Sequence, residues 1–262
     1  MSMPARMNVI GVQLDIAWEE PRANFASVDR LLAGRPPAPG SLVVLPEMFS
    51  TGFSLDVAKT AQGPAREADS FLRTLAMRLD ATVIGGVVSP AANGLGRNEA
   101  VAFSPDGTVL ARYVKQRPFS RVNEHLVHEP GAGTVTFRWG GFTVAPLICY
   151  DLRFPELFRD AARAGADLFV VIAAWPARRI GHWLALLRAR AIENQAWVIG
   201  VNRCGREPDA VYNGRSLVVE PLGEITADAG EGEGLLEATV DVETARAWRA
   251  EFPALRDARW QG

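Results

Sequence analysis

Apolar and polar positions along this chain follow two periods, and their alternation predicts a mixed α/β fold. Short apolar runs indicate strands at residues 8–14, 41–45, 82–88, 101–103, 109–115, 135–139, 142–148, 167–172, 197–201, 215–220 and 235–240. Longer stretches with apolar residues at helical spacing indicate helices at residues 21–33, 65–79, 154–164 and 178–195. Strands that alternate with helices are typical of α/β domains. No repeat or long linker interrupts the pattern, so we expect one domain over residues 1–262.

Local motifs add detail to this fold. The motif SPDG predicts a hairpin turn between residues 103 and 109, and a Gly-Gly pair predicts another turn before residue 142. The strands at 215–220 and 235–240 are expected to pair around the segment PLGE. The helix at 178–195 is expected to direct one apolar face inward, formed by Leu184, Leu187, Ala191 and Ile192.

A cysteine stands at one predicted turn from strand to helix. Cys149 follows the strand at 142–148 and precedes the helix-like run at 154–164. Such a turn presents its side chains at the carboxyl edge of a sheet, where open α/β folds place their ligands. A helix amino terminus also favours the thiolate, which is the nucleophilic form of cysteine. A buried core cysteine is the alternative, because free cysteine is among the most buried residue types.

Two charged residues also stand at strand ends. Glu47 follows the buried strand at 41–45, where a carboxylate is costly unless it is paired or takes part in chemistry. Lys115 ends the alternating run that begins at Val109. Either charge alone is typical of a solvated edge. A carboxylate, a cation and a thiol together, however, are the groups that acyl transfer needs.

These residues resemble the signature of the nitrilase, or carbon–nitrogen hydrolase, superfamily. Glu47 in LPEMFSTGF, Lys115 in YVKQRPF and Cys149 in LICYDLRFPE match its three blocks in order, and the resemblance extends over nearly the whole chain. It implies a four-layer α-β-β-α sandwich that packs into homodimers or higher homo-oligomers. The loop after Lys115 departs from the superfamily's Lys-x-His-Leu-Phe segment, since it reads KQRPF.

The resemblance also implies a reaction. The segments STGF after Glu47 and NEH at residues 123–125 look most like the ω-amidase branch, which hydrolyses the terminal amide of 2-oxo acid amides such as 2-oxoglutaramate. The alternatives within the family are a deaminated glutathione amidase and an N-carbamoyl amino-acid hydrolase. The expected products are a carboxylic acid and ammonia, formed through a thioester on Cys149. Such a reaction requires no metal and no organic cofactor.

The residue types suggest the role of each group. Glu47 is expected to take the proton of Cys149, while Lys115 and the backbone N–H of Tyr150 stabilise the oxyanion. Glu124 is a fourth expected participant, since many members of the superfamily carry a second glutamate after the lysine block. A charge on a surface loop is the alternative for this residue.

Three residues are candidates for the substrate pocket. Arg153 offers a planar fork that matches a carboxylate, and Arg117 lies close to Lys115 along the chain. Trp175 follows the strand at 167–172 and is expected to form a wall of the pocket. The alternatives are an ion pair between Arg153 and a core acid, and a plain packing role for Trp175.

Composition excludes several other classes of protein. The 262 residues carry a formal net charge of −2 with no run of Lys or Arg, so we expect no nucleic-acid partner. Two cysteines do not suggest a disulfide framework. The amino terminus lacks the apolar core of a signal peptide, and no apolar stretch is long enough to span a membrane. We therefore expect a cytoplasmic protein.

Three other features have plainer explanations. His125 and His128 have a spacing that can chelate zinc, but the chain has three histidines in all and no HExxH motif, so surface or loop histidines are favoured. A non-catalytic binding protein of the same fold is possible in principle, although binding alone does not require a base, a cation and a thiol. Cys204 follows a strand without a base at matching spacing, and we interpret it as structural.

Overall fold

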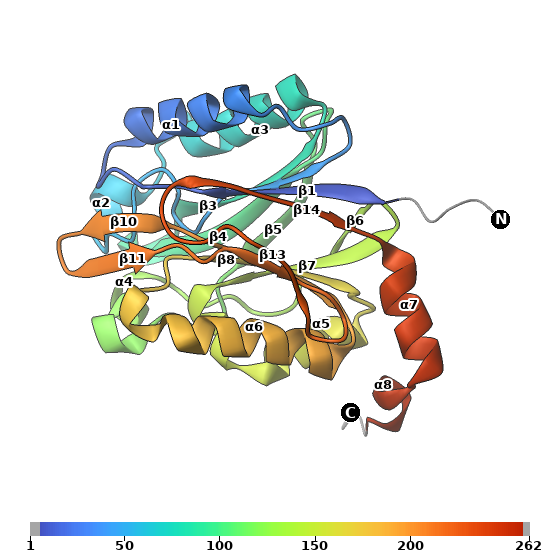
Figure 1. Cartoon of the computed structure of the whole chain (residues 1–262). Helices are drawn as coiled ribbons and strands as arrows, with labels where there is room; N and C mark the ends of the chain where they lie inside the picture. The colour runs from blue at the N-terminus through green and yellow to red at the C-terminus, as the bar shows by residue number, and fades with distance from the viewer. Residues whose placement is uncertain (1–5, 259–262) are drawn as a thin grey trace.

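A computed structural model shows four layers of secondary structure and describes residues 6–258. Two six-stranded sheets lie face to face, and helices cover the outer side of each sheet (Figure 1). The predicted α-β-β-α sandwich is therefore confirmed. Residues 1–5 and 259–262 belong to the predicted domain of residues 1–262 but lie outside the described residues.

The first sheet has the strand order β14-β1-β2-β3-β4-β5. Its strands are β1 (Met7–Gln13), β2 (Leu42–Val44), β3 (Thr82–Pro90), β4 (Gly96–Phe103), β5 (Val109–Val114) and β14 (Gly234–Val240). The three strands β1, β2 and β3 run parallel. Helices α1 (Pro21–Gly34) and α3 (Glu67–Leu79) cover the outer face of this sheet. Helix α1 begins at a proline, whose missing N–H would have no partner at that position anyway.

The second sheet has the strand order β13-β12-β9-β8-β7-β6. Its strands are β6 (Phe137–Trp139), β7 (Phe142–Ile148), β8 (Leu168–Ala173), β9 (Trp197–Asn202), β12 (Leu217–Val219) and β13 (Ile225–Asp228). Here β7, β8 and β9 run parallel. Helices α5 (Pro155–Arg163) and α6 (Ile180–Asn194) cover the outer face.

Shorter elements lie at the ends of these layers. They are the hairpin of β10 (Cys204–Glu207) and β11 (Ala210–Asn213), the helices α2 (Val57–Thr60), α4 (Glu124–Val127), α7 (Val242–Glu251) and α8 (Ala254–Asp257), and the 3₁₀ turns η1 (Ala92–Gly94), η2 (Ser120–Val122), η3 (Cys149–Arg153) and η4 (Ala177–Arg179). The sequence analysis did not predict this hairpin or these helices. All of them except α7 are too short to display a period.

The main hydrophobic core lies between the two sheets. β-Branched side chains from both sheets meet there without solvent contact, among them Val44, Ile84, Val144, Val170 and Val201. The opposite faces of the same strands pack on the helices in separate apolar layers. The central strands are therefore buried on both faces, and they read as continuous apolar runs for this reason.

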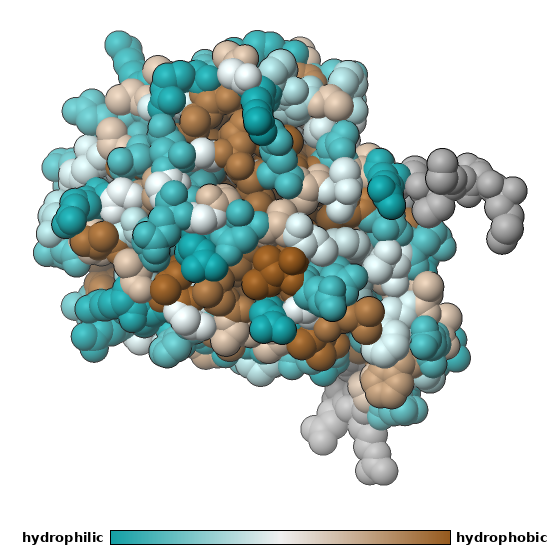
Figure 2. All heavy atoms as spheres, viewed as in Figure 1, coloured by the Kyte–Doolittle hydropathy of each residue, from teal (hydrophilic) through white to brown (hydrophobic). Residues whose placement is uncertain are grey.

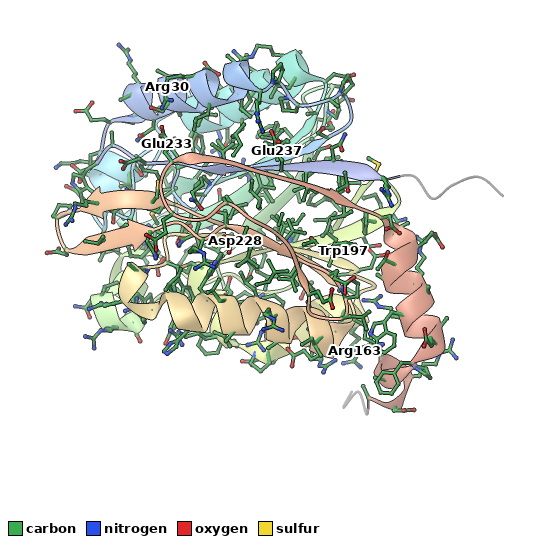
Figure 3. All side chains as sticks on the ribbon, in the orientation of Figure 1. Arg30, Arg163, Trp197, Asp228, Glu233 and Glu237 are labelled. Atoms are coloured by element: carbon green, nitrogen blue, oxygen red, sulfur yellow. The ribbon has the colours of Figure 1, made fainter. Side chains whose placement is uncertain are left out.

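Ion pairs fasten helix α1 to the edge strand β14 and to the loop before it. Arg30 lies 2.5 Å from Glu233, and Arg35 lies 2.8 Å from Glu237. Figure 3 shows Arg30 on the helix above Glu233, with Glu237 farther along the strand. Both pairs are largely exposed, so each contributes at most about 1 kcal/mol to stability.

Two details of the predicted packing are wrong. The strands predicted at 215–220 and 235–240 do not pair: β12 pairs with β9 and β13, whereas β14 pairs antiparallel with β1 in the other sheet. The apolar run at 235–240 instead forms the edge strand of the first sheet beside β1. Ile192 of α6 points outward and is 50% exposed, while Leu187 and Ala191 are buried as predicted.

We expect Gly86→Ala to disturb the turn that carries Glu47. A Cβ at Gly86 would lie 2.5 Å from the backbone N of Met48 and 2.6 Å from the Cα of Glu47, so the backbone itself would have to move. We predict a loss of about 2 kcal/mol in the free energy of unfolding, measured by urea denaturation. Gly181→Ala is the matched control, since nothing lies within 4 Å of its added Cβ. Equal stability of the two variants would contradict the prediction.

Candidate active site

Glu47 lies just beyond β2, in a turn that contacts β3 closely. The N–H of Gly86 donates to the carbonyl of Pro46 at 3.1 Å, and the N–H of Phe49 donates to the carbonyl of Gly86 at 3.2 Å. The side chain of Glu47 is fully buried. A buried carboxylate requires hydrogen bonds or opposite charge to be stable.

Three donors meet the requirement of this carboxylate. Its Oε1 accepts from Lys115 Nζ at 2.8 Å and from Asn98 Nδ2 at 2.7 Å. Its Oε2 accepts from the backbone N–H of Ala174 at 2.9 Å. Sequence reasoning missed Asn98 and Ala174. Asn98 lies between Arg97 and Glu99 in a polar stretch that gives no signal of a buried site, and Ala174 acts through its backbone alone.

Lys115 follows β5 and is almost completely buried. Its Nζ donates to Glu47 Oε1 at 2.8 Å and to the two oxygens of Glu124 at 3.0 and 2.8 Å. The same ammonium lies 5.3 Å from the centre of the Phe53 ring. Burial alone would lower the pKa of Lys115, but the charges of Glu124 and Glu47 raise it above its ordinary value. The side chain is therefore a permanent cation.

Glu124, the first residue of α4, lies in the same buried cluster. It accepts hydrogen bonds from Lys115, from Asn98 Nδ2 at 3.0 Å and from the N–H of Phe119 at 2.5 Å. Burial opposes ionisation, but the Lys115 charge and these donors hold the pKa of Glu124 below its ordinary value. The alternative of a surface loop charge is wrong, because the side chain has no solvent contact.

Cys149 occupies the turn between β7 and η3. Its backbone φ is 46°, in the left-handed region that residues other than glycine rarely adopt. Backbone strain of this kind is common at functional sites. The Sγ lies 3.8 Å from the carbonyl oxygen of Ala174. Cys149 also lines a pocket that opens to solvent, so a small molecule can reach its sulfur.

The expectation that a helix terminus would favour the thiolate of Cys149 is wrong. Burial raises the pKa of the thiol well above its ordinary value. The negative charge of Glu47 and a hydrogen bond between the two side chains raise it further, while Lys115 only partly opposes this. Helix α5 begins several residues later, at Pro155, and is too remote to compensate. The resting group is a thiol beside a carboxylate that can accept its proton.

Asp151 joins the cysteine turn to the lysine segment, and sequence reasoning missed it. Its Oδ2 accepts from Tyr113 Oη at 2.8 Å and from the N–H of Ile148 at 3.0 Å. Its Oδ1 accepts from the N–H of Arg117 at 2.9 Å. The residues on either side of Lys115 are thereby tied to the strand end before Cys149. Burial raises the pKa of Asp151 to about 7.

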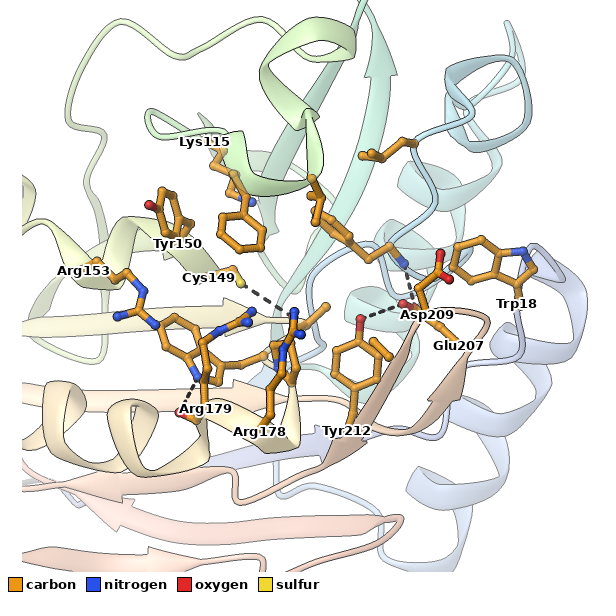
Figure 4. A pocket seen from close by; sticks show the side chains of 18 residues that line it. Trp18, Lys115, Cys149, Tyr150, Arg153, Arg178, Arg179, Glu207, Asp209 and Tyr212 are labelled. Atoms are coloured by element: carbon orange, nitrogen blue, oxygen red, sulfur yellow. Dashed lines mark hydrogen bonds between the residues drawn. The ribbon is translucent and has the colours of Figure 1, made fainter.

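The pocket in front of Cys149 has a cavity volume of about 290 Å³, which suits a small molecule. Aromatic side chains form much of its wall, namely Trp18, Phe53, Phe119, Tyr150, Trp175 and Tyr212. Figure 4 shows Lys115 and Tyr150 on one side of Cys149 and Tyr212 on the hairpin opposite. The site therefore has reactive groups at its base and a largely apolar wall.

The three pocket candidates lie in different places. Arg153 lines the pocket, with its guanidinium 4.8 Å from the centre of the Trp175 ring and 3.2 Å from His182 Nδ1. Trp175 also lines the pocket, and its indole N–H donates to the carbonyl of Arg179 at 2.9 Å. The alternative of a core acid for Arg153 is wrong, since none of the described acids lies within ion-pair distance of it. Trp175 combines packing with pocket formation.

Arg117 lies elsewhere. Its guanidinium is 3.5 Å from Glu156 and stacks over the Phe154 ring at 5.4 Å. It does not appear among the described side chains that line the pocket. The structure therefore gives no support for Arg117 as a substrate ligand, although its backbone N–H serves Asp151.

Sequence reasoning missed the charged residues at the pocket wall. Arg178 and Arg179 of η4 and Glu207 and Asp209 of the β10–β11 hairpin all line it. Glu207 accepts from the N–H of Phe53 at 2.8 Å and from the Tyr212 hydroxyl at 2.7 Å. The hairpin is thereby fixed to the STGF segment. A charged residue in a loop has no sequence signal that tells a pocket wall from open surface.

The remaining candidates lie outside this cluster of reactive groups. His125 is exposed and His128 is buried, and among residues 6–258 no group of three potential metal-ligating side chains gathers. Cys204 is buried, and burial raises its pKa to about 12, which fits a structural role. Within the described part of the chain, no helix is both long and apolar enough to cross a membrane.

Comparison with known proteins places the chain among carbon–nitrogen hydrolases. The carbon–nitrogen hydrolase family model matches residues 11–250. The chain is 39% identical to the omega-amidase YafV of Yersinia enterocolitica, with 94% of each chain covered. It is 32% identical to the 2-oxoglutaramate amidase of Bacillus subtilis, over 95% of this chain and 96% of that protein.

A solved structure gives the same result for the fold. The crystal structure of a carbon–nitrogen hydrolase superfamily protein of Xanthomonas campestris, which carries an arsenic adduct in its active site, matches with a TM-score of 0.90. The two proteins are 34% identical, and the match covers 98% of this chain and 99% of the other. The resemblance inferred from the Glu, Lys and Cys blocks is confirmed.

We expect the buried Asp151 to make stability depend on pH. Its folded pKa of about 7 lies above the ordinary value of 3.8, so between these values the folded chain holds a proton that the unfolded chain has lost. The contribution of Asp151 to stability is therefore complete below about pH 4 and is lost as the pH rises to about 7.

Urea denaturation of Asp151→Asn and wild type checks this expectation. Between pH 4.5 and pH 7.5 the free energy of unfolding of the variant should rise relative to wild type by up to about 3 kcal/mol, because each pKa unit corresponds to about 1.4 kcal/mol. The exposed Asp160→Asn is the charge-matched control, for which the difference from wild type should stay flat. A flat difference for Asp151→Asn would show that its carboxyl group does not titrate in this range.

Proposed function

The chain belongs to the carbon–nitrogen hydrolase family, and we propose that it is an ω-amidase that hydrolyses the terminal amide of a 2-oxo dicarboxylic acid monoamide. The proposed substrates are 2-oxoglutaramate and 2-oxosuccinamate, and the products are the dicarboxylic acid and ammonia. The relatives named omega-amidase and 2-oxoglutaramate amidase support the substrate class. The observation that carries the chemistry is the convergence of Glu47, Lys115 and Cys149 at the base of one small pocket.

The first half of the reaction forms a thioester. The amide carbon of the substrate approaches Cys149 Sγ, and Glu47 takes the thiol proton as the C–S bond forms. The carbonyl oxygen becomes an oxyanion, which the Lys115 ammonium and the backbone N–H of Tyr150 stabilise. Glu47 then delivers the proton to the nitrogen, the C–N bond breaks, and ammonia departs.

The second half releases the acid. A water molecule takes the place of ammonia, and Glu47 removes its proton as the oxygen attacks the thioester carbon. The same donors stabilise the second oxyanion. The C–S bond breaks, the sulfur recovers a proton, and the carboxylic acid leaves. One carboxylate can serve both halves because its donors from Asn98, Lys115 and Ala174 keep it in one orientation.

Glu124 acts as a positioning residue in this scheme. The two carboxylates of Glu47 and Glu124 hold the Lys115 ammonium from two sides, which fixes the direction of its remaining N–H. Asp151 has a similar role for the peptide segments around Cys149 and Lys115. Neither residue has to contact the substrate.

We also propose that the enzyme forms homodimers and acts in the cytoplasm. Exposed apolar side chains lie close together at α6 and the turn before β13, since a Cβ on Gly223 would lie 2.5 Å from Ile192, and Leu222 beside it is 55% exposed. Figure 2 shows brown, apolar spheres gathered over α6 and β13. A second copy of the chain would cover this surface.

Ammonia release from 2-oxoglutaramate by wild type and by Cys149→Ala is the direct test. Wild type should release ammonia, and the variant should be at least about 1,000-fold slower because it has no nucleophile. Mass spectrometry of acid-quenched wild type should find an acyl group on Cys149. Cys204→Ala is the control, which should keep the wild-type rate.

Two results would overturn parts of the proposal. Equal rates for wild type and Cys149→Ala would reject the thiol mechanism. Thiol-dependent hydrolysis of deaminated glutathione or an N-carbamoyl amino acid, with none of 2-oxoglutaramate, would retain the mechanism and replace the substrate.

Glu124→Gln should lower kcat about 10- to 100-fold and leave KM nearly unchanged, since one charged partner of Lys115 is worth about 1.5–3 kcal/mol. Steady-state kinetics with the same substrate measures both constants, and circular dichroism checks that the fold is intact. The matched control is Glu129→Gln, a partly exposed glutamate nearby that pairs with Arg97. An unchanged kcat in Glu124→Gln would remove Glu124 from the mechanism.

A further inference from the structure

Three arginines line the same pocket as Cys149: Arg153, Arg178 and Arg179. Among residues 6–258, no carboxylate lies within ion-pair distance of any of the three. Figure 4 shows Arg178 and Arg179 extending from one turn toward the space in front of Cys149, with Arg153 beside Tyr150. Positive charge is therefore concentrated at one side of the pocket without a protein partner.

Aromatic side chains hold two of these arginines in place. The Arg153 guanidinium lies 4.8 Å from the centre of the Trp175 ring, and that of Arg179 lies 5.3 Å from the centre of the Phe119 ring. The carbonyl of Arg179 also accepts the Trp175 indole N–H, which anchors its backbone. A cation–π contact orients a guanidinium without neutralising it. Arg153 also lies 3.2 Å from His182 Nδ1 through one of its amino groups, and its remaining N–H groups and those of Arg179 have no carboxylate partner among the described residues.

The charges repel one another at this position. Burial lowers the pKa of Arg179, and the charges of Arg178, Arg153 and Arg121 lower it further, while a negative charge on Cys149 would raise it. A guanidinium nevertheless remains charged at any ordinary pH. The repulsion means that an anion placed among these groups gains favourable interactions with several cations at once.

The neighbouring wall, formed by the β10–β11 hairpin, carries acidic side chains. Glu207 and Asp209 line the pocket from the β10–β11 hairpin. The charge of Glu207 is balanced by the buried Arg203, with which it forms an ion pair. Asp209 is exposed at the hairpin tip. An anionic group is therefore repelled from the hairpin side and attracted to the side of η4.

We propose that Arg179 and Arg153, with Arg178 at the rim, form a carboxylate subsite that binds the end of the substrate remote from the amide. This inference rests on the proposed function and adds a rule of specificity to it. A guanidinium fork pairs with a carboxylate through two parallel hydrogen bonds. An amide that carries a carboxylate at its far end is selected over a neutral amide.

The same subsite discriminates against amino-acid amides. Glutamine carries an ammonium next to its carboxylate, whereas 2-oxoglutaramate has a neutral carbonyl at that position. The ammonium would lie among the three guanidinium groups and would be repelled by them. The positive charge at the pocket wall would thus select the 2-oxo acid over the amino acid, although the arginines do not contact the reacting amide.

Kinetics with Arg179→Gln tests the subsite. The KM for 2-oxoglutaramate should rise about 10- to 100-fold with a smaller change in kcat. Arg153→Gln should act in the same direction, and Arg179→Lys should lie between wild type and Arg179→Gln, because lysine keeps the charge without the fork. The control is Arg78→Gln, which removes the same charge from an exposed residue of α3 that does not line the pocket. Its KM should equal that of wild type.

A binding measurement separates the subsite from the reaction. Isothermal titration of 2-oxoglutarate into Cys149→Ala measures the Kd without turnover. This Kd should rise about 10- to 100-fold in the double variant with Arg179→Gln and stay constant in the double variant with Arg78→Gln. A Kd and a KM that do not change in Arg179→Gln would overturn the subsite and leave the amidase proposal standing. If the enzyme does not hydrolyse 2-oxoglutaramate but binds 2-oxoglutarate in a way that depends on these arginines, the subsite stands and the proposed substrate is overturned.

Discussion

The buried ion cluster of Lys115, Glu47 and Glu124 is the interaction on which the rest of this structure depends. One ammonium and two carboxylates lie in the protein interior, where an unpaired charge costs several kcal/mol. The cluster is stable only if β2, β5 and α4 bring the three side chains together with donors from Asn98, Phe119 and Ala174. The two-sheet sandwich provides this arrangement, because each contributing segment follows a strand or a turn at the same end of the molecule.

The predictable part of the site is the part that local patterns encode. Glu47, Lys115 and Cys149 each follow an apolar run, so the apolar pattern alone places them at strand ends. The pairing of β14 with β1 could not be predicted, since it joins the two ends of the chain and no local period records it. The same reason explains why the wall residues Arg178 and Arg179 were missed. In the sequence they resemble any loop arginine, and only the packing of η4 beside the β10–β11 hairpin places them at the pocket.

The protonation state of Cys149 shows how burial can outweigh a local rule. The amino terminus of a helix carries only a partial positive charge, so it favours a thiolate weakly. Here the thiol lies next to the negative charge of Glu47 at the base of a largely apolar pocket, and both the charge and the partial loss of water raise its pKa and favour the protonated form. Asp151 responds to the same low-dielectric surroundings, although three hydrogen bonds hold it. A resting thiol is less prone to oxidation than a thiolate, and in the proposed mechanism it becomes nucleophilic only when Glu47 takes its proton.

The charges of the pocket are arranged to match one kind of ligand. At the base, two carboxylates and one ammonium leave an excess of one negative charge around the thiol, so an anionic group is repelled there and a neutral amide is accepted. At the wall, Arg153, Arg178 and Arg179 leave an excess of positive charge. A molecule with a neutral amide at one end and a carboxylate at the other satisfies both regions in one orientation only. In the mechanism proposed above, that orientation directs the amide carbon toward Cys149, so the electrostatics that would select the substrate would also align it for attack.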